Sequence, residues 1–325
     1  MIKKYTFLSL VMLMLNYSFA QVTEGEKTLR TVSNDTIKGW KNGGVFALNL
    51  AQTSLINWAA GGQNSFAING LVSVFANYKG GKDVWNNSLD LGYGLLRQSK
   101  EVGWMKTDDK IDFLSKYGRQ FSKGWYYAAL LNFKTQMTAG YNYPNDSVKI
   151  SNLLAPAYLL GALGVDFKPN SYFSLFAAPL TLKTTIVNDQ TLADAGSFGV
   201  DKAVYDDAGM ILTKGKMIRN ELGGYVRIIY SRNKFNQEWL KNVAFTTKMD
   251  FFSNYLHEPQ NIDVSWETQI AFKVNKYISV NVNTHLLYDH DINIAVDTNG
   301  DGIMDRSGPR VQFKEILGVG FAYKF

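Results

Sequence analysis

The chain has 325 residues, a formal net charge of +6 and no cysteine. It therefore forms no disulfide and has no thiol chemistry. The charge is too weak, and the Lys and Arg residues too scattered, for the basic patch that nucleic-acid binding needs. We expect no nucleic acid among the partners.

Residues 1–20 have the pattern of a secretory signal peptide. Lys3 and Lys4 give the positive start, residues 7–15 are apolar, and Ser18-Phe19-Ala20 precedes Gln21 as a cleavage site. The apolar run is too short to cross a bilayer as a helix. Cleavage removes two lysines and no acid, which leaves a net charge of +4. No cysteine follows the cleavage point, which excludes a lipoprotein anchor.

Residues 21–42 are polar, and we expect them to form a periplasmic lead-in. From residue 43 to 325, apolar residues recur at every second position, which is the period of a β-strand. In the last strand, for example, Leu317, Val319 and Phe321 alternate with small residues. We predict twelve strands, over residues 43–52, 64–78, 84–97, 107–118, 124–137, 155–168, 171–182, 219–231, 240–254, 261–274, 277–290 and 312–325.

The connections between these strands alternate in length. Short turns such as 79–83 and 169–170 alternate with longer loops such as 138–154, 183–218 and 291–311. Short periplasmic turns and longer external loops are typical of a transmembrane barrel. Pro179 lies late in the seventh strand and cannot donate to the ladder, so we expect it at the external rim or in a bulge, with the strand ending nearby.

Aromatic residues lie near the short-turn ends of the apolar faces, where a girdle at the membrane interface is expected. They are Tyr78, Trp85, Trp125, Tyr127, Phe167, Tyr230, Tyr323 and Phe325. The alternative, that these rings form the core of a soluble β-protein, is disfavoured because the opposite faces carry charges at mid-strand. We predict an all-β fold: a transmembrane, antiparallel, up-and-down β-barrel of about twelve strands.

Several short segments stand out between the strands and at their ends. They are Gly39-Trp40 with Gly43-Gly44, and residues 57–62, 91–96, 106–110, 141–147, 188–193 and 252–255. Together they resemble one family of Gram-negative bacteria, which is catalogued as domain of unknown function 3078. The resemblance spans roughly residues 38–325. It implies a multi-pass barrel in the outer membrane, in contact with its lipids, and it implies no activity. The terminal Phe325 also resembles the signal that the barrel-assembly machinery reads during insertion.

The segment Asp297–Asp305 resembles the start of a calcium loop, because oxygen ligands stand at alternate positions around glycines. Asp297, Asn299, Asp301 and Asp305 would supply side-chain oxygens to Ca²⁺. The pattern is incomplete, since Gly308 stands where a bidentate Glu is needed. The alternative is a polar hairpin loop, because Asn-Gly and Asp-Gly are also turn signals.

An outer-membrane hydrolase of the lipase or protease type is the alternative function. Such an enzyme needs a His within hydrogen-bond reach of a nucleophile. The chain has three His residues: we expect His285 to face the lumen and His257 and His290 to lie at loop margins. No Ser stands in a nucleophile-elbow pattern, so we expect no enzymatic role.

We expect charged residues to face the interior of the barrel. The expected acids are Asp90, Asp112, Asp166, Glu221, Asp250, Asp263, Glu267 and Asp289. The expected bases are Lys110, Lys116, Lys134, Lys168, Arg227, Lys248, Lys273, Lys314 and Lys324. A nearly neutral interior favours ion pairs across the lumen or a narrow channel for small polar solutes over a strongly ion-selective pore. A structural or partner-binding barrel is the other possibility, and the loop 183–218 could fold inward as a plug.

Overall fold

The computed structural model describes residues 38–55, 63–98, 103–143, 145–233, 235–274, 278–296 and 305–324. The expected signal peptide, and the expected lead-in up to residue 37, lie outside this part of the chain. Within it, no helix is long and apolar enough to cross a membrane.

Twelve long strands form one closed antiparallel barrel, in which consecutive strands of the chain are neighbours. They are β1 (Gly39–Thr53), β2 (Ser65–Gly80), β3 (Asp83–Gln98), β4 (Trp104–Ser122), β5 (Trp125–Thr135), β8 (Ala157–Phe167), β9 (Phe173–Ile186), β12 (Ile218–Arg232), β13 (Val243–Asn254), β14 (Ile262–Lys273), β15 (Ile278–Tyr288) and β18 (Gln312–Lys324). Pairing of β1 with β18 closes the barrel, from Val45–Lys324 to Leu48–Phe321. The predicted up-and-down barrel is confirmed, and each predicted strand overlaps one observed strand.

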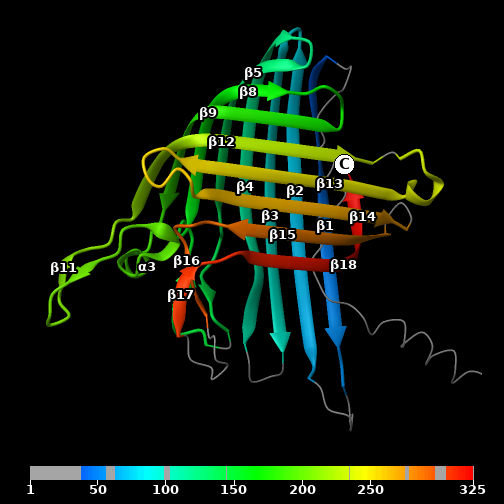
Figure 1. Cartoon of the computed structure of the whole chain (residues 1–325). Helices are drawn as coiled ribbons and strands as arrows, with labels where there is room; N and C mark the ends of the chain where they lie inside the picture. Colours follow the sequence, from blue (N-terminus) through cyan, green and yellow to red (C-terminus); the bar gives the residue numbers. More distant parts are fainter. Residues whose placement is uncertain are drawn as a thin grey trace, which may run out of the picture.

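The two walls of the barrel run in different directions. Figure 1 shows the strands β9, β12–β15 and β18 crossing in front of β1–β4 at a large angle. This follows from strand tilt, because strands inclined by about 35–45° to the barrel axis cross the opposite wall at twice that angle. The crossing brings side chains from strands far apart in the sequence toward one another inside the barrel.

The connections differ between the two ends of the barrel. One end, the short-turn end, includes the turns 81–82 and 123–124; the other, the long-loop end, includes 54–64, 136–156, 187–217 and 289–311. The predicted alternation is thus present. One pair departs from it, because the short-turn connection 233–242 is longer than the long-loop connection 255–261.

The first strand begins earlier than the sequence predicts. β1 starts at Gly39, so residues 39–42 belong to the barrel rather than to the lead-in. The reason is Trp40, whose ring packs against Tyr78 at 5.4 Å and Trp85 at 5.6 Å between centroids. This aromatic contact extends the β1–β2 ladder to the short-turn end, where Gly39 pairs with Lys79.

Side chains alternate between a buried interior and an apolar outer face. In β13, every second residue from Ala244 to Phe252 is buried, including the charged Lys248 and Asp250. Large hydrophobic residues such as Leu131 and Leu163 are instead exposed on the outside. A polar interior and an apolar exterior are the arrangement of a transmembrane barrel.

Aromatic rings on the outer face gather in pairs at the short-turn end. Trp125 packs on Phe167 at 4.4 Å, and Tyr230 contacts both Tyr172 and Phe245. These contacts agree with the predicted girdle. The side chain of Tyr323 and the whole of Phe325 lie outside the described part.

Pro179 lies in a β-bulge in the middle of β9. The register with β8 passes from Leu163–Leu180 to Val165–Ala177, and the register with β12 shifts at the same place. The expected bulge is therefore present, but the expectation that the strand ends nearby is wrong, since β9 continues to Ile186. The extra residue reverses which positions face inward, because Ala178 and then Thr181 are buried while Pro179 and Leu180 are exposed.

Smaller elements lie in the connections at the long-loop end. They are β6 (Gly140–Tyr141), β7 (Lys149–Ser151), the helix α3 (Gln190–Asp194), the turn η1 (Ser197–Gly199), β10 (Val204–Tyr205), β11 (Ile211–Thr213), β16 (Asn293–Val296) and β17 (Arg306–Pro309); the turn η2 (Glu238–Leu240) lies at the short-turn end.

The loop 187–217 packs at the rim of the barrel. Val187, Leu192, Ala193 and Val200 form a buried apolar cluster with Ala155 of the neighbouring loop. The hairpin β10–β11 extends away from the barrel (Figure 1). Residues 183–186, which the possible plug included, are part of β9. In the rest of the loop, the carbonyl of Gly199 accepts a hydrogen bond from Arg219 at 2.9 Å.

Candidate functional site in the lumen

Most of the charged residues predicted to face inward do so. Asp90, Asp112, Lys116, Asp166, Glu221, Arg227, Lys248 and Asp250 are buried in the barrel. Lys273 is instead exposed at the end of β14, and the side chain of Lys324 lies outside the described part. Buried charges of this kind are tolerated when they are paired, and the interior indeed contains several clusters of ion pairs.

The cluster nearest the short-turn end is centred on Asp166 of β8. Its Oδ2 accepts from Lys116 Nζ at 2.8 Å and from Lys168 Nζ at 3.1 Å, and its Oδ1 accepts from Ser174 at 2.8 Å. The Lys116 ammonium also lies over the ring of Phe176. Three strands, β4, β8 and β9, are joined by this cluster.

A second cluster, beside the first, includes an apolar group. Arg227 donates to Asp250 from Nε at 2.6 Å and from Nη2 at 3.0 Å, and the Tyr225 hydroxyl donates to the same carboxylate at 2.8 Å. Tyr225 belongs to a buried apolar group with Phe176 and Phe252, together with Ala128, Leu130, Ala162 and Ala178. Apolar side chains therefore fill part of the lumen between β5 and β13.

A third cluster, which we call the mouth cluster, lies at the long-loop end. It contains Lys183, Arg219, Glu221, Asp263, Asp289 and Asp291. Lys183 Nζ lies 2.7 Å from Asp263 Oδ2 and 3.5 Å from both Asp289 Oδ2 and Glu221 Oε2. Arg219 donates to Asp291 and, at 3.2 Å, to Glu221.

The mouth cluster connects strands that are not neighbours. Lys183 comes from β9, whereas Asp263 is on β14 and Asp289 directly follows β15. In the order of hydrogen-bonded strands around the barrel, β12 and β13 lie between β9 and β14. These ion pairs therefore reach across the interior and narrow the lumen at its long-loop end.

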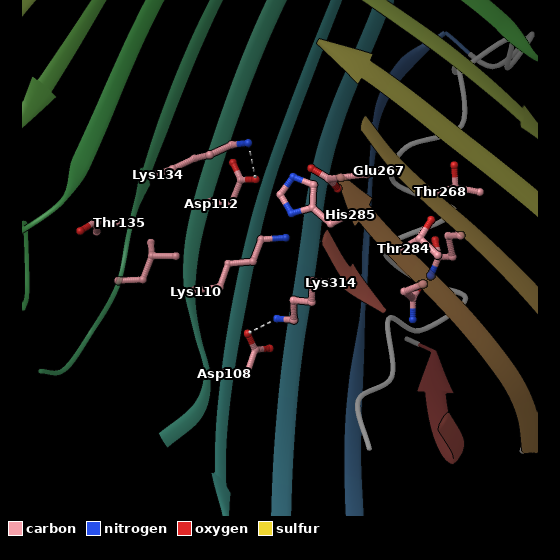
Figure 2. Close-up of a pocket in the computed structure, with 13 residues that line it drawn as sticks. Asp108, Lys110, Asp112, Lys134, Thr135, Glu267, Thr268, Thr284, His285 and Lys314 are labelled. Atoms are coloured by element: carbon pink, nitrogen blue, oxygen red, sulfur yellow. Dashed lines mark hydrogen bonds and ion pairs between the residues drawn. The ribbon is translucent and has the colours of Figure 1, made fainter. Parts of the chain in front are cut away.

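A cavity of about 260 Å³, which we call the lumen cavity, lies between opposite walls of the barrel. Lys110, Asp112 and Lys134 reach it from β4 and β5, and Glu267, His285 and Lys314 from β14, β15 and β18 (Figure 2). Two ion pairs border it: Lys134 Nζ–Asp112 Oδ2 at 3.8 Å and Lys314 Nζ–Asp108 Oδ1 at 3.5 Å. The second pair joins β18 to β4 across the interior.

Exposure falls with depth in the lumen cavity. The side chain of Lys314 is 52% exposed and that of Asp108 35%, whereas that of Asp112 is 10% exposed. Asp108 lies nearer the long-loop end of β4 than Asp112 does, and Lys314 is close to the start of β18. The cavity is therefore most accessible from the long-loop end.

One of the three histidines forms the kind of pair that a hydrolase would need. His285 faces the lumen as predicted, and its Nε2 lies 3.0 Å from Ser265 Oγ. His290 follows β15, with Nδ1 3.0 Å from the Tyr288 hydroxyl, and the exposed His257 lies in the loop 255–261. The Ser265–His285 pair was missed in the sequence because neither residue stands in a local motif; adjacent strands bring them together.

The predicted calcium loop falls largely outside the described residues. Asp297, Asn299 and Asp301 belong to the segment 297–304, and Asp305 is exposed just before β17. On either side of this segment, Val296 of β16 pairs with Arg306 of β17. Among the residues that are described, no group of three or more His, Asp and Glu is arranged to hold a metal ion.

Comparison with known families gives a match over part of the chain. Residues 50–141, from the end of β1 to β6, match the family described as "Protein of unknown function (DUF3078)". The resemblance found in the sequence is confirmed over this range, which includes the segments 57–62, 91–96 and 106–110. The description assigns no activity, and no curated protein matches the chain.

Several solved structures of outer-membrane proteins are similar to the chain at low sequence identity. An outer-membrane channel from Pseudomonas putida F1 is 9% identical, with 94% of this chain and 100% of that chain covered and a TM-score of 0.40. The NanC porin is 9% identical, with 86% and 98% covered and a TM-score of 0.37. The translocator domain of the autotransporter NalP from Neisseria meningitidis is 8% identical, with 90% and 91% covered and a TM-score of 0.34. These likenesses assign no function to this chain.

Proposed function

We propose that the protein is an outer-membrane β-barrel that forms a narrow channel for small polar solutes. The observation that carries this proposal is the lumen cavity, which is lined mainly by charged and polar residues from opposite walls and is reachable from the long-loop end. Twelve strands lie between eight, where side chains fill the interior, and sixteen, which leave an open aqueous channel. A barrel of this intermediate strand number favours a narrow channel through the lumen.

The proposed location in the outer membrane is supported by the surface of the barrel. Leucines such as Leu131, Leu163, Leu180 and Leu182 are exposed on the outer face. In a bilayer, these side chains would contact lipid tails, and the aromatic pairs at the short-turn end would lie at the interface. Insertion by the barrel-assembly machinery belongs to the same proposal, on the resemblance of the C-terminal strand to its signal.

Conductance in planar bilayers tests the channel. We expect steady unitary currents, smaller than those of a sixteen-stranded porin, because the mouth cluster narrows the lumen. The folded state of each preparation is checked by its altered mobility in unheated gel samples. A folded barrel that carries no current would contradict the channel and favour a structural or partner-binding barrel.

The Ser265–His285 pair makes an outer-membrane hydrolase the second candidate. At 3.0 Å, His285 could act as general base toward the Ser265 hydroxyl. Turnover of a phospholipid or peptide that is lost in both Ser265→Ala and His285→Ala would establish this role. Turnover that persists in these variants, or that depends on His290 alone, would remove the pair as its source.

A further inference from the structure

A buried amide group in the lumen cavity has no hydrogen-bond partner among the residues that the structure describes. Asn283 of β15 is 8% exposed and lines the cavity, and neither Nδ2 nor Oδ1 forms a hydrogen bond. A buried amide without a partner is destabilising, so native structures rarely contain one. A side chain of this kind in a cavity points to a molecule that supplies the missing hydrogen bonds.

The residues that line the cavity carry balanced charges, and a further lysine lies beside them. The cations are Lys110, Lys134 and Lys314, together with Lys248, which lies 2.6 Å from Glu267. The carboxylates are Asp108, Asp112 and Glu267. The lining itself therefore balances at three cations and three carboxylates, with His285 counted as neutral. Lys248 adds a fourth ammonium group beside the cavity, and it also interacts with Asp250.

The four lysines approach from several directions. Lys110 and Lys134 come from the β4–β5 wall, whereas Lys314 comes from β18 and Lys248 from β13. In Figure 2, Lys110 and Lys134 point toward His285 and Glu267 of the opposite wall. An anionic group between the walls could therefore contact ammonium groups from both sides.

The size of the cavity limits what it can hold. At about 260 Å³, it lies just below the roughly 300–1,000 Å³ typical of sites for drug-sized ligands. It suits a small molecule of roughly ten heavy atoms or fewer, since a cavity of about 150 Å³ already holds benzene.

From these observations we propose that the lumen cavity binds a small solute that carries a carboxylate group. The carboxylate contacts the lysine ammonium groups, and Asn283 donates a hydrogen bond to it from Nδ2. This proposal names the class of solute that the proposed channel would carry. Its claim about transport therefore rests on the proposed function. Binding itself can be measured separately.

Ligand-observed NMR and calorimetric titration of the full purified barrel in detergent test the proposal, with sodium acetate as the probe. Glycerol and methylammonium serve as uncharged and cationic probes of similar size. We expect acetate to bind at least tenfold more tightly than either. Glycine, which carries both charges, then distinguishes a plain carboxylate site from one that also accepts an ammonium group.

Two variants test the residues that carry the proposal. Asn283→Leu removes the amide at similar volume, and Lys134→Met removes one ammonium group. Each should weaken acetate binding about tenfold or more, as expected for loss of a hydrogen bond to a charged group. Asn283→Leu should also be at least as heat-stable as the wild type, because it removes a buried amide without a partner. The control is Lys168→Met, which changes a lumen lysine outside the cavity and should leave acetate binding unchanged.

The outcomes separate this proposal from the channel. Acetate affinity that is unchanged in Asn283→Leu and Lys134→Met, or equal affinity for glycerol, would overturn the carboxylate site. Unitary currents without acetate binding would likewise overturn it and leave the channel in place. Acetate binding by a barrel that carries no current would support the site and contradict the channel.

Discussion

Lys183 is the cation that three carboxylates of the mouth cluster share. Four acids and two bases in that cluster give a net charge of −2, and Lys183 is 13% exposed there. Removing one partner of a buried ion pair leaves charges that nothing compensates, which typically costs about 3–5 kcal/mol. This residue therefore affects both the stability of the barrel and the electrostatic field at the long-loop end.

We predict that Lys183→Met lowers the free energy of unfolding by about 3 kcal/mol. It should also raise the permeability of the barrel to cations relative to anions, because the charge of the mouth cluster falls from −2 to −3. Urea titration and the reversal potential in a salt gradient measure the two effects. Lys241→Met, which removes only the exposed ion pair with Glu238, is the control. Unchanged ion selectivity would show that permeating ions do not pass the mouth cluster.

Asp189 holds the start of the helix α3. Its carboxylate accepts from Lys149 Nζ at 2.6 Å, from Asn152 Nδ2 at 3.1 Å and from the backbone N–H of Thr191 at 3.2 Å. The hydrogen bond from Lys149, above all, lowers the pKa of Asp189 below its ordinary value. A lowered carboxyl pKa means that this stabilisation is complete above the ordinary pKa, near 4, and is lost as the pH falls below it.

We predict that the loop 187–217 loses protection from hydrogen exchange when the pH is lowered from 7 to 3. Asp189→Ala should have the same effect at pH 7, with rates corrected for their intrinsic pH dependence. Asp201→Ala is the matched control, because its ion pair with Lys216 is solvent-exposed. If protection at pH 3 equals that at pH 7, the cap does not hold the loop.

At the scale of elements, the bulge in β9 depends on Gly164 of β8. A Cβ atom on Gly164 would lie 2.0 Å from the backbone oxygen of Ala177 and 2.5 Å from Cα of Ala178. Both atoms belong to the backbone, which cannot move aside easily. On Gly161 of the same strand, a Cβ atom would have no neighbour within 4 Å.

We therefore predict that Gly164→Ala strongly reduces the yield of folded barrel, whereas Gly161→Ala folds like the wild type. The measurement is the fraction of protein with altered gel mobility after refolding, together with its urea midpoint. Equal midpoints for the two variants would mean that the bulge relaxes without cost.

The predicted calcium loop lies in the sequence between β16 and β17. We expect a calcium heat on titration of the purified protein at millimolar concentrations. The heat should be lost in Asp301→Asn, because removing a carboxylate weakens an oxygen site for Ca²⁺. Absence of any calcium heat would leave a polar hairpin loop as the explanation of the motif.

The sequence predicts the strands well because apolar and polar residues alternate with a period of two. This alternation follows from which side of the barrel wall each residue faces. It does not predict that Lys183 faces inward, since the phase of β9 reverses at the bulge and Pro179 gives only an ambiguous signal. Nor was the helix α3 predicted, although Asp189 followed by Gln190 and Thr191 is a readable N-cap. That Lys110 and Glu267 face each other across the lumen depends on strand tilt and side-chain length. No local sequence pattern contains this information.

At the scale of the whole molecule, the arrangement of tryptophans tests contact with lipid. Trp40, Trp85, Trp125 and Trp266 lie on the outer face and are 41–56% exposed, whereas Trp239 is 79% exposed in the connection 233–242. In reconstituted liposomes, the first four should be near acyl chains and Trp239 should not.

We predict that brominated lipids quench the fluorescence of variants that keep only one of those four tryptophans. A variant that keeps only Trp239 should instead be quenched by acrylamide in the water phase. Strong acrylamide quenching of the Trp85 or Trp125 variants would contradict a membrane-facing outer wall.

The bulge has a consequence for the genetics of this barrel. Deleting the Pro179 codon would let Leu163, Gly164 and Val165 pair in plain succession with Leu180, Ala178 and Ala177. Every later residue of β9 would still face the same side of the barrel wall. The side chain of the alanine in Gly164→Ala would then lie beside an ordinary cross-strand neighbour. We therefore expect the deletion, a change usually considered severe, to rescue a substitution usually considered mild. Such sign-reversing epistasis would trace to one surplus residue in the wall.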